Sequence, residues 1–322
     1  MSRLAGGGDG APAFSRWFLV SAWLVEAVAF ALFVVVNRLA SEAGVPNFGY
    51  TLWYALGAGL VLLIIGAIKG DTPPLKPRYV LSYLVLGMTG LAFPFTLMAF
   101  VAPKLPSGIV SMLVVLSPVM TYVFSLIFRL ERFRLLSVIG ILLGLAGVLV
   151  LILPSTSLPS ADMVPWVLLC MLAPSSFGLT NVLAVVLRPP ALSALSMATS
   201  LLLSAAFLLF PITLLMGQIH AFPGPNIDGD LAILYAVGLN IMIWTVFLGA
   251  VRVIGPVLFS QFNYLVVLIG FGFGVLFFGE QPSLYIWLAT ALMFLGLAAI
   301  NWRPRQRGAA GATDEAGSRT TP

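Results

Sequence analysis

The sequence has very little charge, a single cysteine and a single histidine. Of its 322 residues, 8% are charged and 60% are hydrophobic, whereas soluble domains usually carry about 25% charged residues. A soluble core cannot bury this much apolar surface, but a lipid bilayer can. With only Cys170, an intrachain disulfide framework and a cysteine metal cluster are excluded. His220 lies in a loop rich in proline and glycine, which leaves little material for a His-rich metal site or a Ser-His-Asp triad.

The sequence also lacks a phosphate-binding loop, a metal-ligand cluster and a large polar domain. ATP-driven pumping by this chain alone is therefore not expected, and neither a cofactor nor a metal is predicted. A secretory signal has an apolar core of about 7–15 residues. The run from Trp17 to Val36 is longer and contains Glu26, so we interpret it as a retained membrane helix.

Ten long apolar windows are present, each close to the roughly 20 residues that a membrane-spanning helix needs. Because hydrocarbon offers no hydrogen-bond partners, such windows must satisfy their backbone internally as helices. We therefore expect an all-α, polytopic membrane protein. Its ten spans are predicted at residues 17–40, 50–68, 79–102, 107–128, 135–153, 163–187, 193–216, 232–252, 256–279 and 284–302.

The positions of lysine and arginine predict the orientation of these spans. Both residue types favour the cytoplasmic side of a membrane. With the N-terminus inside and ten spans, only Arg38 and Lys104 fall outside. The net charge of +5 is then a topology signal, and no nucleic-acid partner is expected. We predict that both termini are cytoplasmic.

The two halves of the chain correspond when Glu131 is aligned with Glu280, an offset of 149 residues. Gly147 then falls on Gly296, and Phe95-Thr96 falls on Trp244-Thr245. Each half holds five predicted spans, and because five is odd the second half must insert upside down. We expect a first five-helix repeat at 17–153 and an inverted second one at 154–302. A cytoplasmic segment at 1–16 and a disordered cytoplasmic tail at 303–322 flank them.

Glu131 and Glu280 occupy equivalent places in the two halves. They end the apolar stretches I-F-R-L-E-R-F at 127–133 and L-F-F-G-E-Q-P at 276–282, just before the next helix. A carboxylate there faces the positive end and the free N–H groups of that following helix. We interpret both glutamates as structural caps, with a direct role in substrate binding as the alternative.

These features resemble the drug/metabolite transporter superfamily in its ten-helix, EamA-like form. The stretches that carry the resemblance are L-I-F-R-L-E-R-F-R-L-L-S-V-I-G-I-L-L-G-L-A-G-V-L-V at 126–150 and V-L-F-F-G-E-Q-P at 275–282. The first half departs from the usual Gly-Glu step with Leu130, and the second has Met293 where the first has Gly144. The chain looks most like the YddG-type branch. That resemblance implies export of aromatic and other neutral amino acids across a bacterial inner membrane.

The resemblance also implies that the fifth and tenth helices are scaffold. The glycines of these helices suit such a role, because small residues let membrane helices approach closely. They are Gly140, Gly144, Gly147 and Gly296.

Glu26 is the clear carboxylate within the predicted spans, and a charge at a helix centre costs about 2.5–3.5 kcal/mol on insertion scales. It shares one helical stripe with Trp23, Phe30, Phe33 and Asn37. One interpretation places this stripe on a cavity, where Glu26 binds an ammonium group or carries a proton. The other makes Glu26 a neutral or hydrogen-bonded packing partner of a neighbouring helix. Both stay open.

Further candidates for lining a cavity are polar and aromatic residues inside the spans. They are Tyr83, Ser107, Ser111, Ser176, Asn181, Asn240, Trp244, Ser260, Asn263 and Tyr264. Pro118 and Pro174 are predicted hinges, since proline removes a helix hydrogen bond. The alternatives are that the serines join neighbouring helices and that Trp244 fills core volume.

The leading functional hypothesis is a carrier, not an enzyme, that opens alternately to each side of the membrane. Since no lysine or arginine lies at mid-depth, its expected partners are a small neutral or zwitterionic molecule, such as an amino acid or similar metabolite, and the lipid bilayer. Efflux of drugs or organic cations and a non-transporting membrane scaffold are the alternatives. An intramembrane enzyme would need a nucleophile-base or metal pair within the spans. It is not expected, because Glu26 is the clear carboxylate there and His220 lies in a loop. Energy coupling and oligomeric state stay open.

Overall fold

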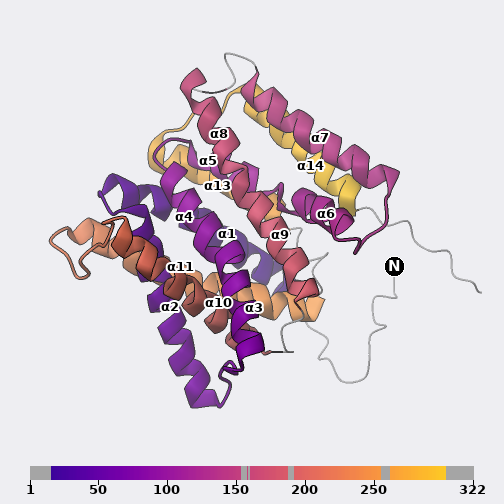
Figure 1. Ribbon diagram of the computed structural model, residues 1–322. Helices are drawn as coiled ribbons and strands as arrows, with labels where there is room; N and C mark the ends of the chain where they lie inside the picture. Colours follow the sequence, from indigo (N-terminus) through magenta and orange to yellow (C-terminus); the bar gives the residue numbers. More distant parts are fainter. Residues whose placement is uncertain (1–15, 154–157, 159, 188–191, 255–261, 302–322) are drawn as a thin grey trace, which may run out of the picture.

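The computed structural model describes residues 16–153, 158, 160–187, 192–254 and 262–301, and helices make up most of these ranges (Figure 1). Most of the predicted N-terminal segment, the predicted tail and Ser260 lie outside them. The first half contains α1 (Arg16–Glu42), α2 (Asn47–Lys69), α3 (Pro77–Gly87), the π-helix η1 (Met88–Ala92), α4 (Phe93–Val101), α5 (Ser107–Val114), α6 (Ser117–Ile127) and α7 (Leu135–Ile152). The second half contains the 3₁₀ turn η2 (Ala161–Met163), α8 (Val164–Cys170), α9 (Leu172–Val186), α10 (Ala194–Leu215), α11 (Ile227–Ile254), α13 (Phe262–Phe278) and α14 (Leu284–Asn301).

The helices fall on the predicted spans. Within the described residues, eight helical stretches are long and apolar enough to cross a membrane. The shorter apolar helices Asn263–Phe278 and Leu284–Ile300 occupy the last two predicted windows. The chain is therefore a multi-pass, all-helical membrane protein, as its apolar windows predict.

Two of the spans are broken at the places that their prolines dictate. A proline ring clashes with the carbonyl of the residue four positions earlier. For Pro118 that residue is Val114, the last of α5, and for Pro174 it is Cys170, the last of α8. After α5, the N–H of Leu116 bonds to the Leu113 carbonyl, a tighter turn than an α-helix makes (3.0 Å). Both predicted hinge prolines thus lie just after a real helix break.

The helix pair α7 and α14 shows that the halves are inverted. A Cβ at Gly140 would lie 2.5 Å from the carbonyl oxygen of Gly296, and one at Gly147 would lie 2.9 Å from that of Ala289. The contacts run in opposite directions along the two helices, so the helices are antiparallel. The offset of 149 residues turns Gly140 into Ala289 and Gly147 into Gly296, so the two contacts are exchanged. Equivalent helices that pack antiparallel through exchanged residues are related by a two-fold axis, as an inverted repeat requires.

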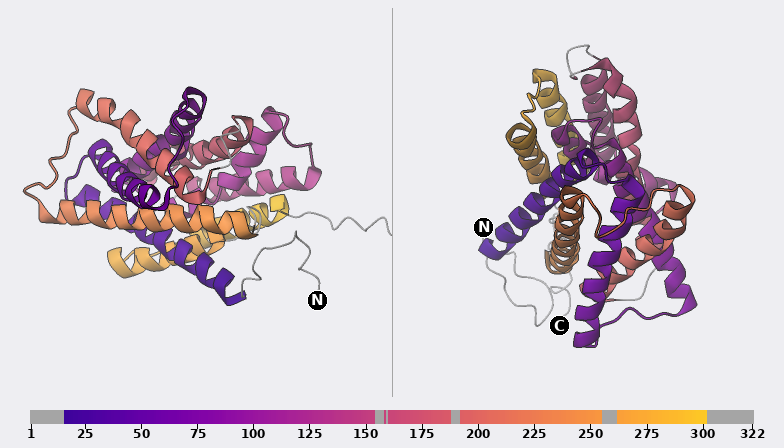
Figure 2. Two further views of the ribbon diagram at one scale, coloured as in Figure 1. Left: turned by 90° about the horizontal axis from the view of Figure 1, so that it is seen from below. Right: turned by 90° about the vertical axis from the view of Figure 1, so that its left-hand side faces the viewer.

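The other helix contacts obey the same symmetry. The equivalent helices α2 and α10 pack against each other, and Gly59 approaches Leu203 while Gly66 approaches Leu195, again antiparallel. Helix α1 packs against α11 and α13, and its counterpart α9 packs against α4 and α6. Figure 2 shows the long helix α11, in orange, lying beside the indigo α1 in both views. The centre of the bundle is therefore built from both halves.

Candidate functional site

Phe95 on α4 lies at the middle of a group of aromatic rings contributed by both halves. Its ring centroid is 5.3 Å from that of Phe33 and 6.4 Å from that of Phe30, both on α1. It is also 5.5 Å from Phe177 on α9 and 6.5 Å from Trp244 on α11. We call Phe30, Phe33, Phe95, Phe177 and Trp244 the central aromatic cluster.

This cluster lies where the two repeats meet. Phe95 and Trp244 are equivalent residues under the repeat, and two equivalent residues can contact each other only close to the axis that relates them. Proteins built from inverted repeats place their ligand sites near the membrane midplane at this junction. Since Phe95 is 2% exposed, the cluster is an internal site rather than a lipid-facing surface.

Buried polar atoms without protein partners lie on the helices of the cluster. Glu26, one turn before Phe30, is 1% exposed, and its Oε2 has no hydrogen-bond partner among the described residues. Asn240, one turn before Trp244, is fully buried. Its Nδ2 donates to the carbonyl of Ala236 (2.9 Å), and its Oδ1 has no partner within the described part of the chain. Most buried polar atoms are hydrogen-bonded, so these atoms are available to a ligand or to water.

Other buried side-chain atoms, on α1, α2, α4 and α5, share this property. Five atoms find no hydrogen-bond partner in the described part of the structure: Trp23 Nε1, Asn37 Nδ2, Tyr54 Oη, Thr96 Oγ1 and Ser111 Oγ. Trp23 and Ser111 are therefore compatible with their predicted role in lining a cavity.

Aromatic and polar residues fill the space on one side of the cluster. The ring of Phe33 contacts Tyr54 at 5.5 Å, and Tyr54 contacts Tyr50 at 5.1 Å. The Tyr50 hydroxyl donates to Asn37 Oδ1 (2.9 Å). All four side chains are at most 1% exposed. The next residue of α1 is Arg38, so this layer leads from the cluster to the end of the bundle at Glu280.

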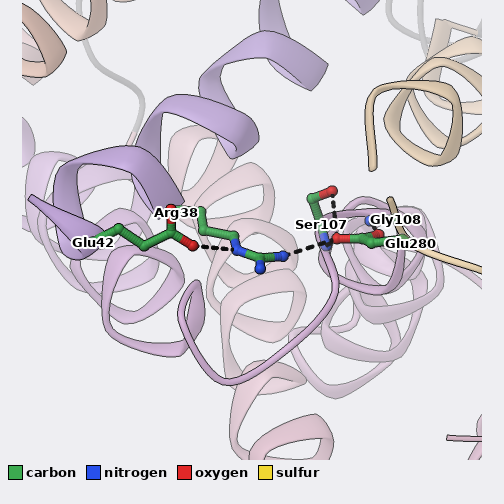
Figure 3. Close-up of polar contacts among 5 residues, drawn as sticks. All are labelled: Arg38, Glu42, Ser107, Gly108 and Glu280. Carbon is green, nitrogen blue, oxygen red and sulfur yellow. Dashed lines mark hydrogen bonds and ion pairs between the residues drawn. The ribbon is translucent and has the colours of Figure 1, made fainter. Parts of the chain in front are cut away.

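Glu280 binds the beginning of α5 (Figure 3). Its Oε1 accepts hydrogen bonds from the Ser107 N–H (2.8 Å), the Ser107 hydroxyl (3.1 Å) and Arg38 Nη1 (3.1 Å). Its Oε2 accepts one from the Gly108 N–H (3.4 Å). Pro106, which precedes α5, has no side-chain acceptor, so Glu280 supplies the cap that the local sequence lacks. We call Arg38, Ser107, Gly108 and Glu280 the Glu280 cluster.

This arrangement differs from the sequence expectation in one respect. Glu280 caps α5 of the other half rather than α14, which follows it and whose Ile286 N–H bonds to Ser283 (3.4 Å). The reason is the chain reversal at Gly279 (φ 62°), after which the Glu280 N–H donates back to the Gly274 carbonyl (3.1 Å). Its partner Ser107 takes part in this cap, and its predicted role in lining a cavity stays a prediction.

The equivalent glutamate has a different environment. Glu131 forms an exposed ion pair with Arg134 (3.2 Å) at the beginning of α7. Its expected capping of α7 is not among the hydrogen bonds found between described residues, and its role as a cap stays a prediction.

The predicted residues of α9 connect three helices. Ser176 donates to the Thr89 carbonyl in the π-helix η1, and the hydroxyls of Thr180 and Thr89 are 2.8 Å apart. Asn181 is exposed, and its Nδ2 donates to Thr121 of α6 (3.0 Å). A cavity of about 350 Å³ lies beside this bridge, lined by Met88, Thr89, Phe93, Phe124, Leu172, Ser175, Ser176 and Leu179.

Two of the predicted residues have partners away from the central aromatic cluster. The Tyr83 hydroxyl reaches the Pro74 carbonyl (3.5 Å), near the beginning of α3. The Tyr264 hydroxyl donates to the Phe294 carbonyl (3.4 Å), and its ring packs on Phe294 at 4.7 Å. Asn263 lies at the beginning of α13, next to residues that are not described.

The sequence analysis missed Phe95, Phe177, Tyr54, Thr96 and Arg38 as site residues. One available signal was the repeat itself, because it aligns Phe95 with the candidate Trp244. The contact of Arg38 with Glu280 had no local signal, since Glu280 lies 242 residues away in the chain.

Comparisons with known proteins agree with this architecture. The sequence matches the EamA-like transporter family twice, at residues 17–153 and 164–302. It is 26% identical over 285 residues to the uncharacterized inner membrane transporter YedA of Escherichia coli strain K12, covering 84% of this chain and 88% of that protein. The YedA proteins of strains O6:H1 and O157:H7 give the same values. A protein of known crystal structure shares the fold, with a TM-score of 0.55, 22% identity, and coverage of 87% of this chain and 96% of the other.

The chain belongs to the EamA-like transporter family. The two matches divide it into halves close to those predicted from the repeat. Members of this family are transporters and not enzymes, so the chain is a membrane transporter rather than an enzyme or a passive scaffold.

Proposed function

We propose that this member of the family exports small neutral or aromatic amino acids by opening the central aromatic cluster alternately to the two sides of a bacterial inner membrane. The observation that carries the proposal is the position of Phe95 and Trp244 on the two-fold axis, beside the unpartnered polar atoms of Glu26 and Asn240. The similarity to inner membrane transporters supports the location.

The chemistry of the cluster fits an amino acid. Aromatic faces attract ammonium groups and stack on flat side chains. Glu26 provides a carboxyl group for the ammonium, and Trp23, about one helical turn away, provides an N–H donor for the carboxylate. Among the buried residues of the described ranges, Glu26 is the charged one, with no buried lysine or arginine beside it. A phosphate-bearing cargo would lack a cationic partner there.

The decisive experiment is transport by the purified protein in proteoliposomes, using a panel of neutral, aromatic, acidic and basic amino acids with and without a pH gradient. We expect saturable transport of neutral and aromatic amino acids and little transport of acidic ones. Equal transport of all classes, or of none, would contradict the proposal.

Export of lipophilic cations is a second candidate, because aromatic rings around one buried acid also suit an organic cation. Competition separates the two candidates. If phenylalanine or leucine competes with the transported amino acid and lipophilic cations do not, the amino-acid proposal stands. The reverse result would favour drug efflux.

The same proposal includes an orientation. The predicted cytoplasmic termini place the Glu280 cluster at the outer surface, where Arg38 is one of the few basic residues. The repeat boundaries at 17–153 and 154–302 are part of the proposal as well, and the two family matches support them.

A further inference from the structure

The Glu280 cluster joins three segments that are far apart in the chain: the end of α1, the beginning of α5 and the loop between α13 and α14. We propose that the Arg38–Glu280 ion pair is the contact that breaks when a gate at this end of the bundle opens. In this gate, Glu280 stays with α5 and α13, while Arg38 moves away with α1. The inference rests on the proposed alternate opening but not on the proposed substrate.

Close packing fixes Glu280 to α5 and α13. Two backbone N–H groups of α5 and the Ser107 hydroxyl bind its carboxylate. A Cβ at Gly274 of α13 would collide with the Glu280 carboxylate and the Ser107 hydroxyl, and one at Gly108 would collide with the Phe271 ring. Separating these elements would leave the first N–H groups of α5 without an acceptor, so they are expected to move as one body.

The bond from Arg38 is easier to break. The ion pair is one N–H···O contact of 3.1 Å between side chains that are 26% and 11% exposed, and the Arg38 guanidinium also lies 3.9 Å from the ring centroid of Phe278 at the end of α13. A cation–π contact at such a partly exposed position contributes about 0.5–1 kcal/mol. Ion pairs that reach solvent contribute little to stability. Arg38 also has a second partner on its own helix, because its Nε donates to Glu42 (2.8 Å). When Arg38 leaves Glu280, its charge therefore remains paired, and Glu280 retains the N–H groups of α5.

A small cavity gives water access to the Glu280 carboxylate. A cavity of about 60 Å³ borders Glu280 and is lined also by Pro106, Ile109, Phe271, Gln281, Pro282 and Ile286. Such a volume is large enough for water, which needs roughly 10–15 Å³, and Glu280 offers it a polar partner. Water in this cavity can take the place of the Arg38 guanidinium on Glu280 as α1 departs.

The movement of α1 would open the central path as well. Phe30 and Phe33 of the central aromatic cluster are on α1, as is Asn37, which accepts from Tyr50. Because a helix moves as a rigid element, displacing Arg38 displaces the residues that fill the layer below it. The Arg38–Glu280 ion pair therefore closes one end of the path that the rings of the central aromatic cluster fill.

A cysteine reporter tests the gate. In a Cys170→Ala background, Asn37→Cys places the only thiol in the layer directly below Arg38, at a position that is 1% exposed. The protein is treated with a hydrophilic maleimide in nanodiscs. Because a nanodisc leaves both membrane faces accessible, the result does not depend on the orientation of the protein. We expect Arg38→Gln to raise the labelling rate about three- to fivefold, because a partly exposed ion pair contributes up to about 1 kcal/mol to the closed state.

Glu42→Gln is the matched control. It removes the other partner of Arg38 but leaves the bond to Glu280, so the labelling rate should stay within about twofold of the parent. Equal labelling of Arg38→Gln and the parent, or equal acceleration by Glu42→Gln, would overturn the proposal.

Hydrogen exchange tests which side of the gate moves. The amides of Ser107 and Gly108 should remain as protected in Arg38→Gln as in the parent, because Glu280 still binds them. They should exchange faster in Glu280→Ala, and Glu280→Gln, which keeps an acceptor oxygen, serves if the alanine variant does not fold. Faster exchange in Arg38→Gln would show that Glu280 leaves α5. If the labelling results hold but no amino acid is transported, the gate stands and the substrate proposal falls.

Discussion

Glu26 combines almost complete burial with a carboxyl oxygen that no described group of the protein binds. A buried charge is costly unless it is paired, and burying an unsatisfied polar group costs about 1–3 kcal/mol. Packing alone would be better served by an apolar side chain of the same size. The position therefore favours the interpretation in which Glu26 contacts substrate or carries a proton.

We predict that Glu26→Gln abolishes transport or uncouples it from an imposed pH gradient, while the protein remains folded. Glutamine keeps the shape and the hydrogen-bonding capacity but cannot be charged. Transport in proteoliposomes with and without the gradient is the measurement, with elution as a monodisperse peak as the check on folding. Glu42→Gln, an exposed acid on the same helix, is the control. Unchanged transport and unchanged pH dependence in Glu26→Gln would leave Glu26 as a packing residue.

Phe95 is predicted to set the preference for aromatic substrates. Phe95→Leu keeps the apolar volume but removes the ring, and ring pairs contribute about 0.5–1.5 kcal/mol beyond their burial. The apparent affinity for aromatic amino acids should fall about three- to tenfold, and that for leucine should change less. Competition curves give both values. The same change at the lipid-facing Phe207, which is 69% exposed, should alter neither.

At the scale of elements, the helix breaks before Pro118 and Pro174 provide places where α5 can turn against α6 and α8 against α9. Proline in a helix does not always have this effect. Pro211 lies within α10, which continues without a break from Ala194 to Leu215. The breaks are therefore a property of particular sites, and each half has one of them, in non-equivalent helices.

Pro118→Ala is predicted to restore the missing helix hydrogen bond and make α5 and α6 one stiffer helix. If the break serves as a hinge, the maximal transport rate should fall severalfold while the substrate affinity is kept. Initial rates over a range of substrate concentrations separate these parameters. Pro211→Ala is the control and should leave the rate unchanged. A normal rate in Pro118→Ala would show that the break is only a packing feature.

Features with a local cause in the sequence could be predicted, and features without one could not. The ten spans follow from long apolar runs, and the helix breaks follow from the prolines themselves. Phe95 could not be singled out in this way, because Phe93 and Phe95 lie in the same apolar run. The π-helix η1 just before them shifts the helical phase, so that Phe93 is 40% exposed and Phe95 is 2% exposed. A constant period of 3.6 residues cannot describe both sides of that bulge.

At the scale of the whole molecule, the features that could not be predicted from the sequence are contacts between the two halves. The capping of α5 by Glu280 spans 173 residues, and nothing near either residue in the chain indicates it. The repeat does carry long-range information, because it relates Phe95 to Trp244 and Gly140 to Ala289. A repeat that is treated as a symmetry operation therefore turns one observed contact into the expectation of a second, as the exchange of Gly140–Gly296 into Gly147–Ala289 shows.

The junction of α7 and α14 permits a test of the close packing between the two halves. Gly140→Ala would bring a Cβ to 2.5 Å from the backbone carbonyl of Gly296, and Gly296→Ala would bring one equally close to that of Gly140. Backbone cannot rotate out of the way as a side chain can, so each change must push the halves apart. Overpacking of this kind costs about 1–3 kcal/mol, and both variants should melt at a lower temperature than the parent.

Gly272→Ala is the matched control for these variants, because a Cβ at Gly272 meets nothing within 4 Å. Alanine favours a helix over glycine by about 1 kcal/mol, so this variant should be at least as stable as the parent. Thermal unfolding followed by tryptophan fluorescence in detergent measures all three. Because Gly140 and Gly296 meet in the same contact, Gly140→Ala and Gly296→Ala should have similar effects, and their combination should destabilise less than the sum. Strict additivity would mean that the two glycines lie in separate contacts and that the junction is not shared by the two halves.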